Sequence, residues 1–247
     1  MDYPVQTEQG ELPLRAAFAF SFDRFRLNQA EYEWSALAFL HYLPHKKSWV
    51  TKEGQRITWD MIARRLMRQK LTQGSCYGTH RLHTLVCILR ANEDNAILSE
   101  ECRKDVTSHL KDATARLVQT QHKDGYWTEQ WQGIEWDGPP RKPTLPIDNR
   151  SQRILATGHT LEWWALAPEE LLPKRDRIIL AAQWIVTTTD GMSDSDIANS
   201  YTFLTHAARA LSLWRGKFPP DAYRPTNKVT DSASTTDVKA TRTEDSP

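Results

Sequence analysis

Three side chains that readily bind transition metals occur at spacings that can bring them together. Cys76 and His80 are four residues apart in GSCYGTH, so on a helix they would share one face. His159 lies in ATGHTLE, a separate segment, and can join them from a neighbouring helix. One thiolate and two imidazoles, with a fourth position left open, form a ligand set typical of catalytic zinc. The alternative is that Cys76 packs against apolar neighbours and both histidines hydrogen-bond to carbonyl groups.

A histidine and a carboxylate form the second candidate for chemistry. His159 and Glu162 are three residues apart, so on one helix they can hydrogen-bond and act as a general acid and base. The same pair can instead be a polar bridge between packed helices, and the sequence leaves both interpretations open. No Gly-rich phosphate loop, HExxH motif or nucleophile in a recognisable turn is present, which disfavours nucleotide-dependent chemistry.

The segments that would position these residues alternate between two kinds of helix. Amphipathic segments, with apolar residues recurring at i, i+3, i+4 and i+7, predict helices with one buried face at residues 14–27, 59–71, 100–121 and 172–188. Segments that are apolar or small on most sides predict helices surrounded by protein at residues 31–44, 78–91, 156–168 and 198–214. Thr58 and Ser99 are placed to cap two of the amphipathic helices. The alternation predicts an all-α fold of about four hairpins, with inner and outer helices.

The chain divides into one helical domain, residues 1–215, and a C-terminal tail, residues 216–247. Within the tail, VTDSASTTDVKATRTEDSP is rich in Ser, Thr and Asp and contains no aromatic residue, which predicts disorder. Residues 133–152 contain closely spaced prolines that forbid a helix, so we expect an extended surface loop there. Signals for β-strands are thin, because no Asn-Gly or Asp-Gly turn joins alternating segments.

Charge and composition disfavour several classes of partner. The 32 Lys and Arg residues balance 31 Asp and Glu residues, leaving a formal charge of +1, so no global field attracts nucleic acid. No apolar run reaches the roughly 18 residues of a membrane-spanning helix, so no membrane span is expected. Three cysteines are too few and odd in number for a disulfide framework, and the first residues are acidic where a signal peptide is basic. We therefore expect a cytoplasmic protein.

One segment resembles the QW motif of terpene and squalene cyclases. In ATARLVQTQHKDGYW, Gln121 stands at the expected end of a helix and is followed by Gly125 and Trp127, as in that motif. Together with the helix alternation over about residues 31–214, the resemblance implies an α/α toroid, a ring of inner and outer helices. The Asp-rich motifs with which these cyclases activate their substrates are missing, with Asp194 and Asp196 coming nearest, so terpene cyclisation is disfavoured. Full toroids have about six hairpins, so this one is expected to be a partial toroid or to be completed by a second copy of the chain, as a homo-oligomer.

The resemblance also implies where a site would lie. Toroids of this kind usually place their sites around the N-terminal ends of the inner helices, where free N–H groups gather. The chemistry-bearing residues expected at those ends are Glu31, Glu33, Cys76, Tyr77, His80, His159, Glu162, Tyr201 and His206. Cys-Tyr-Gly at 76–78 further resembles a zinc motif of the lanthionine-forming cyclases, another α/α toroid. That family's second motif, Cys-His-Gly, is replaced here by Thr157, Gly158 and His159, which leaves one thiolate fewer.

Two functions from different classes remain open. The first is a toroid-like module that binds a small apolar or sugar-like ligand, or a protein partner, without catalysis. Its cavity would be lined by Tyr77, Trp163, Tyr201 and His206, although any one of the ten Trp residues can equally be core. The second is an enzyme, a cyclase, transferase or hydrolase, that is zinc-dependent or uses acid–base chemistry. Its metal ligands would be Cys76, His80 and His159, and its proton carriers His159 and Glu162.

Overall fold

The computed structural model describes residues 2–8, 10–132 and 149–216, and this part of the chain is predominantly helical. Its helices are α1 (Leu14–Arg24), α2 (Tyr32–Tyr42), α3 (Trp59–Arg68), α4 (Thr79–Asn95), α5 (Glu100–Thr120), α6 (Asn149–Leu166), α7 (Arg175–Thr189) and α8 (Asp194–Arg215). Single 3₁₀ turns lie at Leu71–Gln73, Ser75–Gly78 and Glu169–Leu171. The prediction of an all-helical chain is thus confirmed at the level of its main elements. Among the described residues, no helix combines the length and apolarity needed to cross a membrane.

Local capping explains where several helices begin. The Thr58 hydroxyl accepts a hydrogen bond from the Met61 amide at 3.3 Å, and the Ser99 hydroxyl accepts one from the Cys102 amide at 3.2 Å. These two caps, which the sequence predicted, satisfy amide groups that the first turns of α3 and α5 leave free. Ser193 caps α8 in the same way through the Asp196 amide.

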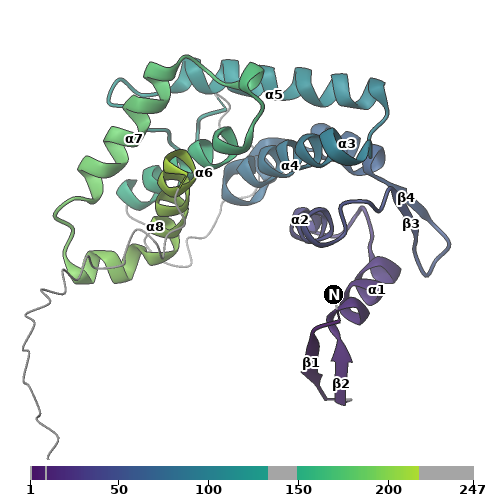
Figure 1. Cartoon of the computed structure of the whole chain (residues 1–247). Helices are drawn as coiled ribbons and strands as arrows, with labels where there is room; N and C mark the ends of the chain where they lie inside the picture. Colours follow the sequence, from purple (N-terminus) through teal and green to yellow (C-terminus); the bar gives the residue numbers. More distant parts are fainter. Residues whose placement is uncertain (1, 9, 133–148, 217–247) are drawn as a thin grey trace, which may run out of the picture.

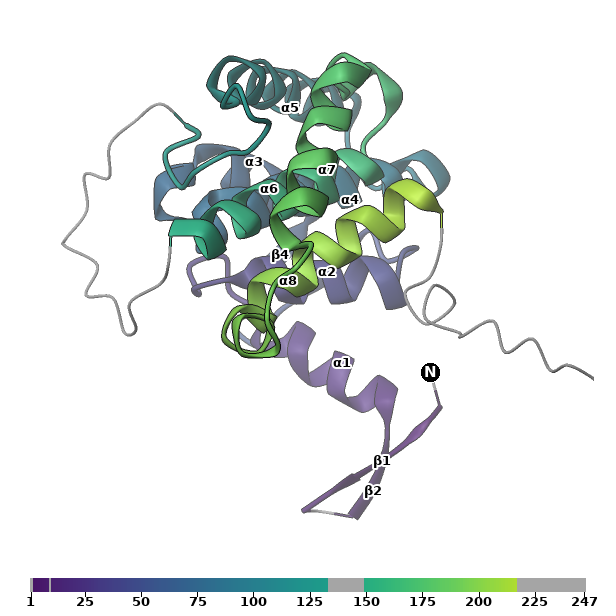
Figure 2. The same ribbon diagram turned by 90° about the vertical axis from the view of Figure 1, so that its left-hand side faces the viewer.

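The helices form two rows. In the first row α2 packs against α4, α4 against α6, and α6 most extensively against α8. In the second row α3 and α5 contact each other and both contact α4, while α7 contacts α6. The rows trace an arc whose two ends are formed by α8 and by α1 with α2 (Figure 1). The view turned by 90° shows α8 in front of α2, at the opposite end of the same arc (Figure 2).

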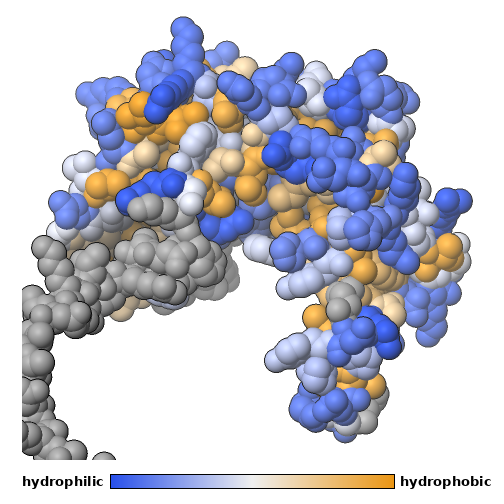
Figure 3. All heavy atoms as spheres, in the orientation of Figure 1, coloured by the Kyte–Doolittle hydropathy of each residue, from blue (hydrophilic) through white to orange (hydrophobic). Residues whose placement is uncertain are grey.

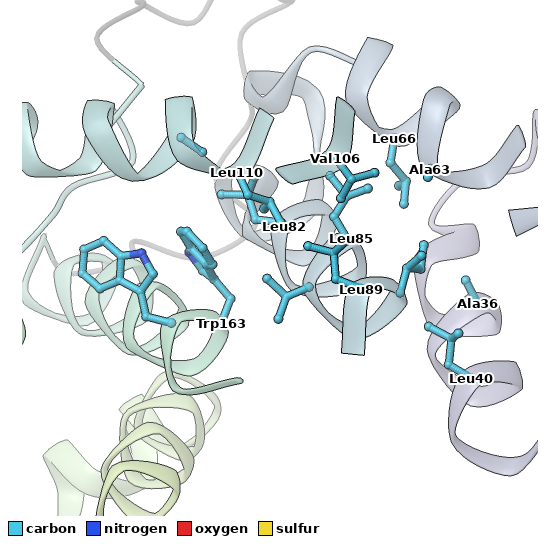
Figure 4. Packing of buried hydrophobic residues seen from close by; sticks show 14 of the residues in the cluster. Ala36, Leu40, Ala63, Leu66, Leu82, Leu85, Leu89, Val106, Leu110 and Trp163 are labelled. Carbon is cyan, nitrogen blue, oxygen red and sulfur yellow. The ribbon is translucent and has the colours of Figure 1, made fainter. Parts of the chain in front are cut away.

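The apolar core lies between the two rows. Leu82, Leu85 and Leu89 of α4 point toward α3 and α5, where Leu66 and Val106 meet them (Figure 4). Full burial of each such side chain contributes roughly 1.5–3 kcal/mol, so this layer is a main source of stability. The opposite face of α4 is left available for polar residues.

The structure differs from the sequence prediction in its strands and in the start of α6. Two antiparallel hairpins are present: β1 (Pro4–Thr7) pairs with β2 (Gly10–Pro13), and β3 (Ser48–Val50) pairs with β4 (Arg56–Thr58). Strands of three or four residues are too short for the period of two to stand out in a sequence. Helix α6 begins at Asn149, so the end of the expected loop at 133–152 is helical, and residues 133–148 lie outside the described part. The tail expected to be disordered also lies outside it, except for Gly216, which caps α8.

Gln121, Gly125 and Trp127 join the end of α5 to α7. The Gln121 amide donates to the Gly125 carbonyl at 3.0 Å and to the Arg177 carbonyl at 2.9 Å, and the Trp127 indole donates to the Leu117 carbonyl at 2.8 Å. Gly125 has φ +109°, and a Cβ there would lie 2.4 Å from the Leu180 carbonyl oxygen, so only glycine fits. These contacts satisfy carbonyls near helix ends, whereas kinship with the cyclases stays a prediction.

Candidate active site

A cavity of about 970 Å³ lies on the concave side of the arc, lined by α2, α4, α6 and α8 and by residues just beyond α2. The space-filling view shows this side hollowed beneath α4, next to α2 and α1 (Figure 3). Helix α2 and the residues after it supply mainly apolar groups, including Trp34, Leu37 and Pro44. The other three helices supply histidines and charged groups. The cavity therefore has an apolar wall and a polar wall.

A polar stripe of α4 forms the middle of the cavity wall. His80, His83 and Cys87 recur at i, i+3 and i+7, and the stripe continues to Ala91 and Asp94. This stripe lies opposite the leucines that face the core, since residues spaced by three and four share one helix face. His83 and Cys87 were not singled out from the sequence. Their helical spacing from His80 was the signal that could have found them.

Glu162 is the centre of the polar wall. Its carboxylate accepts hydrogen bonds from His159 Nδ1 at 2.9 Å, from His206 Nδ1 at 3.2 Å and from Arg209 Nη1 at 3.1 Å. The Glu162 side chain is 3% exposed, and those of His159 and His206 are 4% and 24% exposed. A buried carboxylate needs such partners, because an unpaired charge in this position would cost several kcal/mol. The expected His159–Glu162 pair thus forms part of a larger group with His206 and Arg209, which we call the Glu162 cluster.

The environment of Glu162 keeps its carboxylate ionised. Burial alone would raise its pKa, but the hydrogen bonds that the carboxylate accepts from His159 and His206 outweigh burial and hold the pKa of Glu162 below its ordinary value. Burial lowers the pKa of His159, only partly opposed by its hydrogen bond to Glu162. In its neutral form, His159 directs Nδ1–H at the carboxylate, which leaves its Nε2 without a proton.

All three of the predicted metal ligands come together. Ligand atoms of Cys76, His80 and His159 all lie within 4.8 Å of one another, and the same holds for His159, Glu162 and His206. The His80 and His159 rings contact edge to face with centroids 5.0 Å apart. Both His80 and His159 line the cavity, whereas Cys76 approaches them from the turn that precedes α4.

An unusual turn holds Cys76 in place. Cys76, Tyr77 and Gly78 have φ values of 47°, 61° and 79°, so three consecutive residues are left-handed. The Tyr77 carbonyl accepts hydrogen bonds from the Trp131 indole at 3.1 Å and the Gln132 amide at 2.8 Å. Gly78 lies so close to Leu71 that a Cβ would be 2.4 Å from the Leu71 carbonyl oxygen. The surrounding residues therefore impose a backbone shape that non-glycine residues resist.

Three of the four expected cavity residues lie elsewhere. Trp163 is completely buried in the core between helices, and Tyr201 is 67% exposed on the outside of α8. Tyr77 packs against the core beside Trp131 and does not line the cavity. His206 alone of the four lines it. The side of α6 and α8 that faces inward depends on how these helices pack, which their sequences do not reveal.

The prediction that the site lies at the N-terminal ends of the inner helices is also wrong in part. His80 lies in the first turn of α4, but His159 and Glu162 lie in the second half of α6 and His206 in the middle of α8. The cavity runs along the lengths of α2 and α4. Since α6 starts two turns earlier than expected, its histidine is displaced from the helix end.

The glutamates predicted at the start of α2 have structural roles. Glu33 forms a buried ion pair with Arg81 of α4 at 3.1 Å, and Glu31 accepts a hydrogen bond from the Trp34 indole at 3.3 Å. Trp34 itself lines the cavity and contacts the His80 ring edge to face, with centroids 4.7 Å apart. Trp34 and Arg209 are functional candidates that sequence reasoning missed, and no local pattern distinguishes them.

Comparison of the chain with protein-family models, with curated proteins and with solved structures finds no match. The interpretation of the site therefore rests on its own geometry.

Proposed function

We propose that this chain is an acid–base enzyme that binds a small, largely apolar molecule in its concave cavity. The observation that carries the proposal is the Glu162 cluster, in which a buried carboxylate holds two imidazoles at the cavity wall. A module that only binds apolar ligands does not need a buried carboxylate, because such a charge is stable only when hydrogen-bond donors, here three, surround it. A site for proton transfer does gain, because a carboxylate fixes the tautomer and direction of an imidazole.

His206 is the group that would carry the proton. With Nδ1 directed at Glu162, the Nε2 atom of its neutral form is free to accept a proton from water or from the ligand. Cys76 does not line the cavity, and Cys87 is poorly suited as a nucleophile, because burial raises its pKa to about 11. We therefore assign to His206 the activation of a water molecule, with Glu162 and Arg209 keeping the imidazole in place. The apolar wall at Trp34 and Leu37 would bind the rest of the molecule.

We further propose that the two rows of helices are a partial α/α toroid. The succession of α2, α4, α6 and α8 along the concave side, with α3, α5 and α7 behind them, supports this proposal. In such an arrangement the cavity is the inner wall of an open ring, so a ligand reaches the Glu162 cluster from the open side.

Hydrolysis of an activated apolar ester tests the proposed function. We expect the protein to hydrolyse p-nitrophenyl butyrate, and His206→Gln to lower kcat by about 100-fold or more, the usual contribution of a general base. The matched control is His122→Gln, which should leave kcat unchanged, because His122 also pairs with a carboxylate, that of Asp124 at 3.3 Å, but does not line the cavity. Equal kcat values for the wild type and a folded His206→Gln variant would overturn the proposal, as would a wild-type rate no higher than that of buffer.

A further inference from the structure

Two imidazole nitrogens at the polar wall are buried without a hydrogen-bond partner. They are His80 Nε2 and His159 Nε2, each inaccessible to water. Leaving such a group unsatisfied costs roughly 1–3 kcal/mol, and native structures contain few of them. Because His159 Nδ1 donates to Glu162 at 2.9 Å, Nε2 of the neutral imidazole carries a lone pair rather than a proton. This lone pair could be satisfied by a hydrogen-bond donor or by a metal ion, and the described residues supply no donor.

The turn before α4 places a sulfur atom at this position. Cys76 Sγ lies within 4.8 Å of the ligand atoms of both His80 and His159. A four-coordinate zinc ion holds its ligand atoms roughly 3.3–3.8 Å apart, given bond lengths of about 2.0–2.3 Å. Zinc binding would therefore draw the three side chains closer together. The turn is fixed from outside by Trp131 and Gln132, so the sulfur is held near the two rings.

We propose that Cys76, His80 and His159 bind one zinc ion at the polar wall, with the fourth coordination position open to the cavity. The ligand set of one sulfur and two imidazoles suits zinc and excludes calcium and magnesium, which require oxygen ligands. Because His80 and His159 both line the cavity, the fourth position would be reached from there. Zinc would occupy the space between nitrogens that otherwise have no partner.

Glu162 contacts this site indirectly, through its hydrogen bond with His159. His159, Glu162 and His206 are also close enough to hold a metal ion, but their atoms already satisfy one another by hydrogen bonds. A histidine that donates one ring nitrogen to a carboxylate and binds metal through the other is the usual arrangement around protein-bound zinc. We therefore assign Glu162 as a positioning residue that orients His159. The use of the metal in catalysis rests on the proposed function, whereas binding of the metal does not.

Metal titration of the purified full chain tests the inference. After removal of metal with a chelator, we expect the protein to take up about one zinc ion per chain and to retain it through gel filtration. Cobalt(II), which substitutes for zinc, should give a sulfur-to-cobalt charge-transfer band and the intense visible bands of tetrahedral coordination. Absence of these bands in the folded wild type would overturn the proposal without the use of any variant.

Matched variants locate the site. Cys76→Ser should remove the sulfur-to-cobalt band, while Cys87→Ser should leave it unchanged. Cys87 is a half-buried thiol that lines the cavity but is not one of the three proposed zinc ligands. Glu162→Gln should weaken zinc binding about 10- to 100-fold, as loss of a carboxylate behind a ligating histidine does. A band that survives in Cys76→Ser, or that disappears equally in Cys87→Ser, would refute the assignment of the ligands.

The two proposals fail separately. Zinc uptake with unchanged ester hydrolysis in His206→Gln would leave the metal site and overturn the acid–base function. Loss of hydrolysis in His206→Gln without zinc uptake by the wild type would support the acid–base function and overturn the metal site.

Discussion

At the scale of single residues, the position of Cys76 depends on a glycine. Gly78 follows two left-handed residues, and its own φ of 79° and its contact with Leu71 exclude a side chain. The strain of Cys76 and Tyr77, of order 1–2 kcal/mol each, persists because the core holds the turn from both sides. The Cys76 thiol is thereby kept in place at some cost in stability.

Gly78→Ala should destabilise the protein more than the backbone angle alone explains. Gly54 offers a matched control, because its φ of 81° is nearly the same but nothing lies within 4 Å of the Cβ position. We expect Gly54→Ala to lower the free energy of unfolding by about 1 kcal/mol and Gly78→Ala by about 2–4 kcal/mol, the excess being the collision with Leu71. Urea unfolding of both variants measures the difference. Equal losses would show that the close approach at Gly78 relaxes without cost.

At the scale of elements, the Glu162 cluster requires α6 and α8 to lie unusually close together. A Cβ on Gly158 of α6 would be 2.8 Å from the Ala207 amide nitrogen of α8. The absence of that Cβ allows His206 and Arg209 of α8 to reach Glu162 of α6. The glycine in ATGHTLE thus contributes to the site through helix packing.

Gly158→Ala should destabilise the protein although alanine is the better helix former. In an exposed part of a helix, glycine to alanine stabilises by roughly 1 kcal/mol, whereas here the added methyl forces α8 away at an expected cost of about 1–3 kcal/mol. Ala208→Gly, on the exposed side of α8, measures the ordinary helix preference as a control. Thermal or urea unfolding gives both values, and a stabilised Gly158→Ala would contradict the inferred close packing.

At the scale of the whole molecule, the cavity wall makes stability depend on pH. Burial lowers the pKa of His83 to about 4, with the charge of Arg209 acting in the same direction. The unfolded chain therefore binds a proton at His83 at higher pH than the folded chain does. The stability contributed by neutral His83 is complete above its unfolded pKa of about 6.5 and is lost as the pH falls toward about 4.

His83→Gln should reduce this acid sensitivity. Between about pH 7 and about pH 5 we expect the wild type to lose on the order of 1–2 kcal/mol more unfolding free energy than the variant. Urea unfolding at several pH values measures it, with chelator present so that metal binding does not contribute. An identical pH dependence of the wild type and His83→Gln would show that His83 is hydrated in the folded protein.

The sequence by itself determined the features that depend on local interactions. The alternation of amphipathic and apolar segments gave the order of the helices, and the hydroxyls of Thr58 and Ser99 marked two helix starts, because capping and periodicity act within a few residues. The same spacing rule placed His159 next to Glu162. The short β-hairpins and the start of α6 at Asn149 were not predicted from the sequence. Short strands carry little periodic signal, and a proline-rich segment does not show where the following helix begins.

Only the tertiary structure decided which residues face the cavity. His206 and Arg209 meet Glu162 across two helices, at separations of 44 and 47 residues, while Tyr201 on the same helix points to solvent and Trp163 beside Glu162 is core. Every apolar inner helix looks alike on most sides, so its sequence does not distinguish the face toward the cavity from the face toward the core. That choice follows from how closely backbones can approach, as at Gly158, and such contacts exist only once the helices have packed.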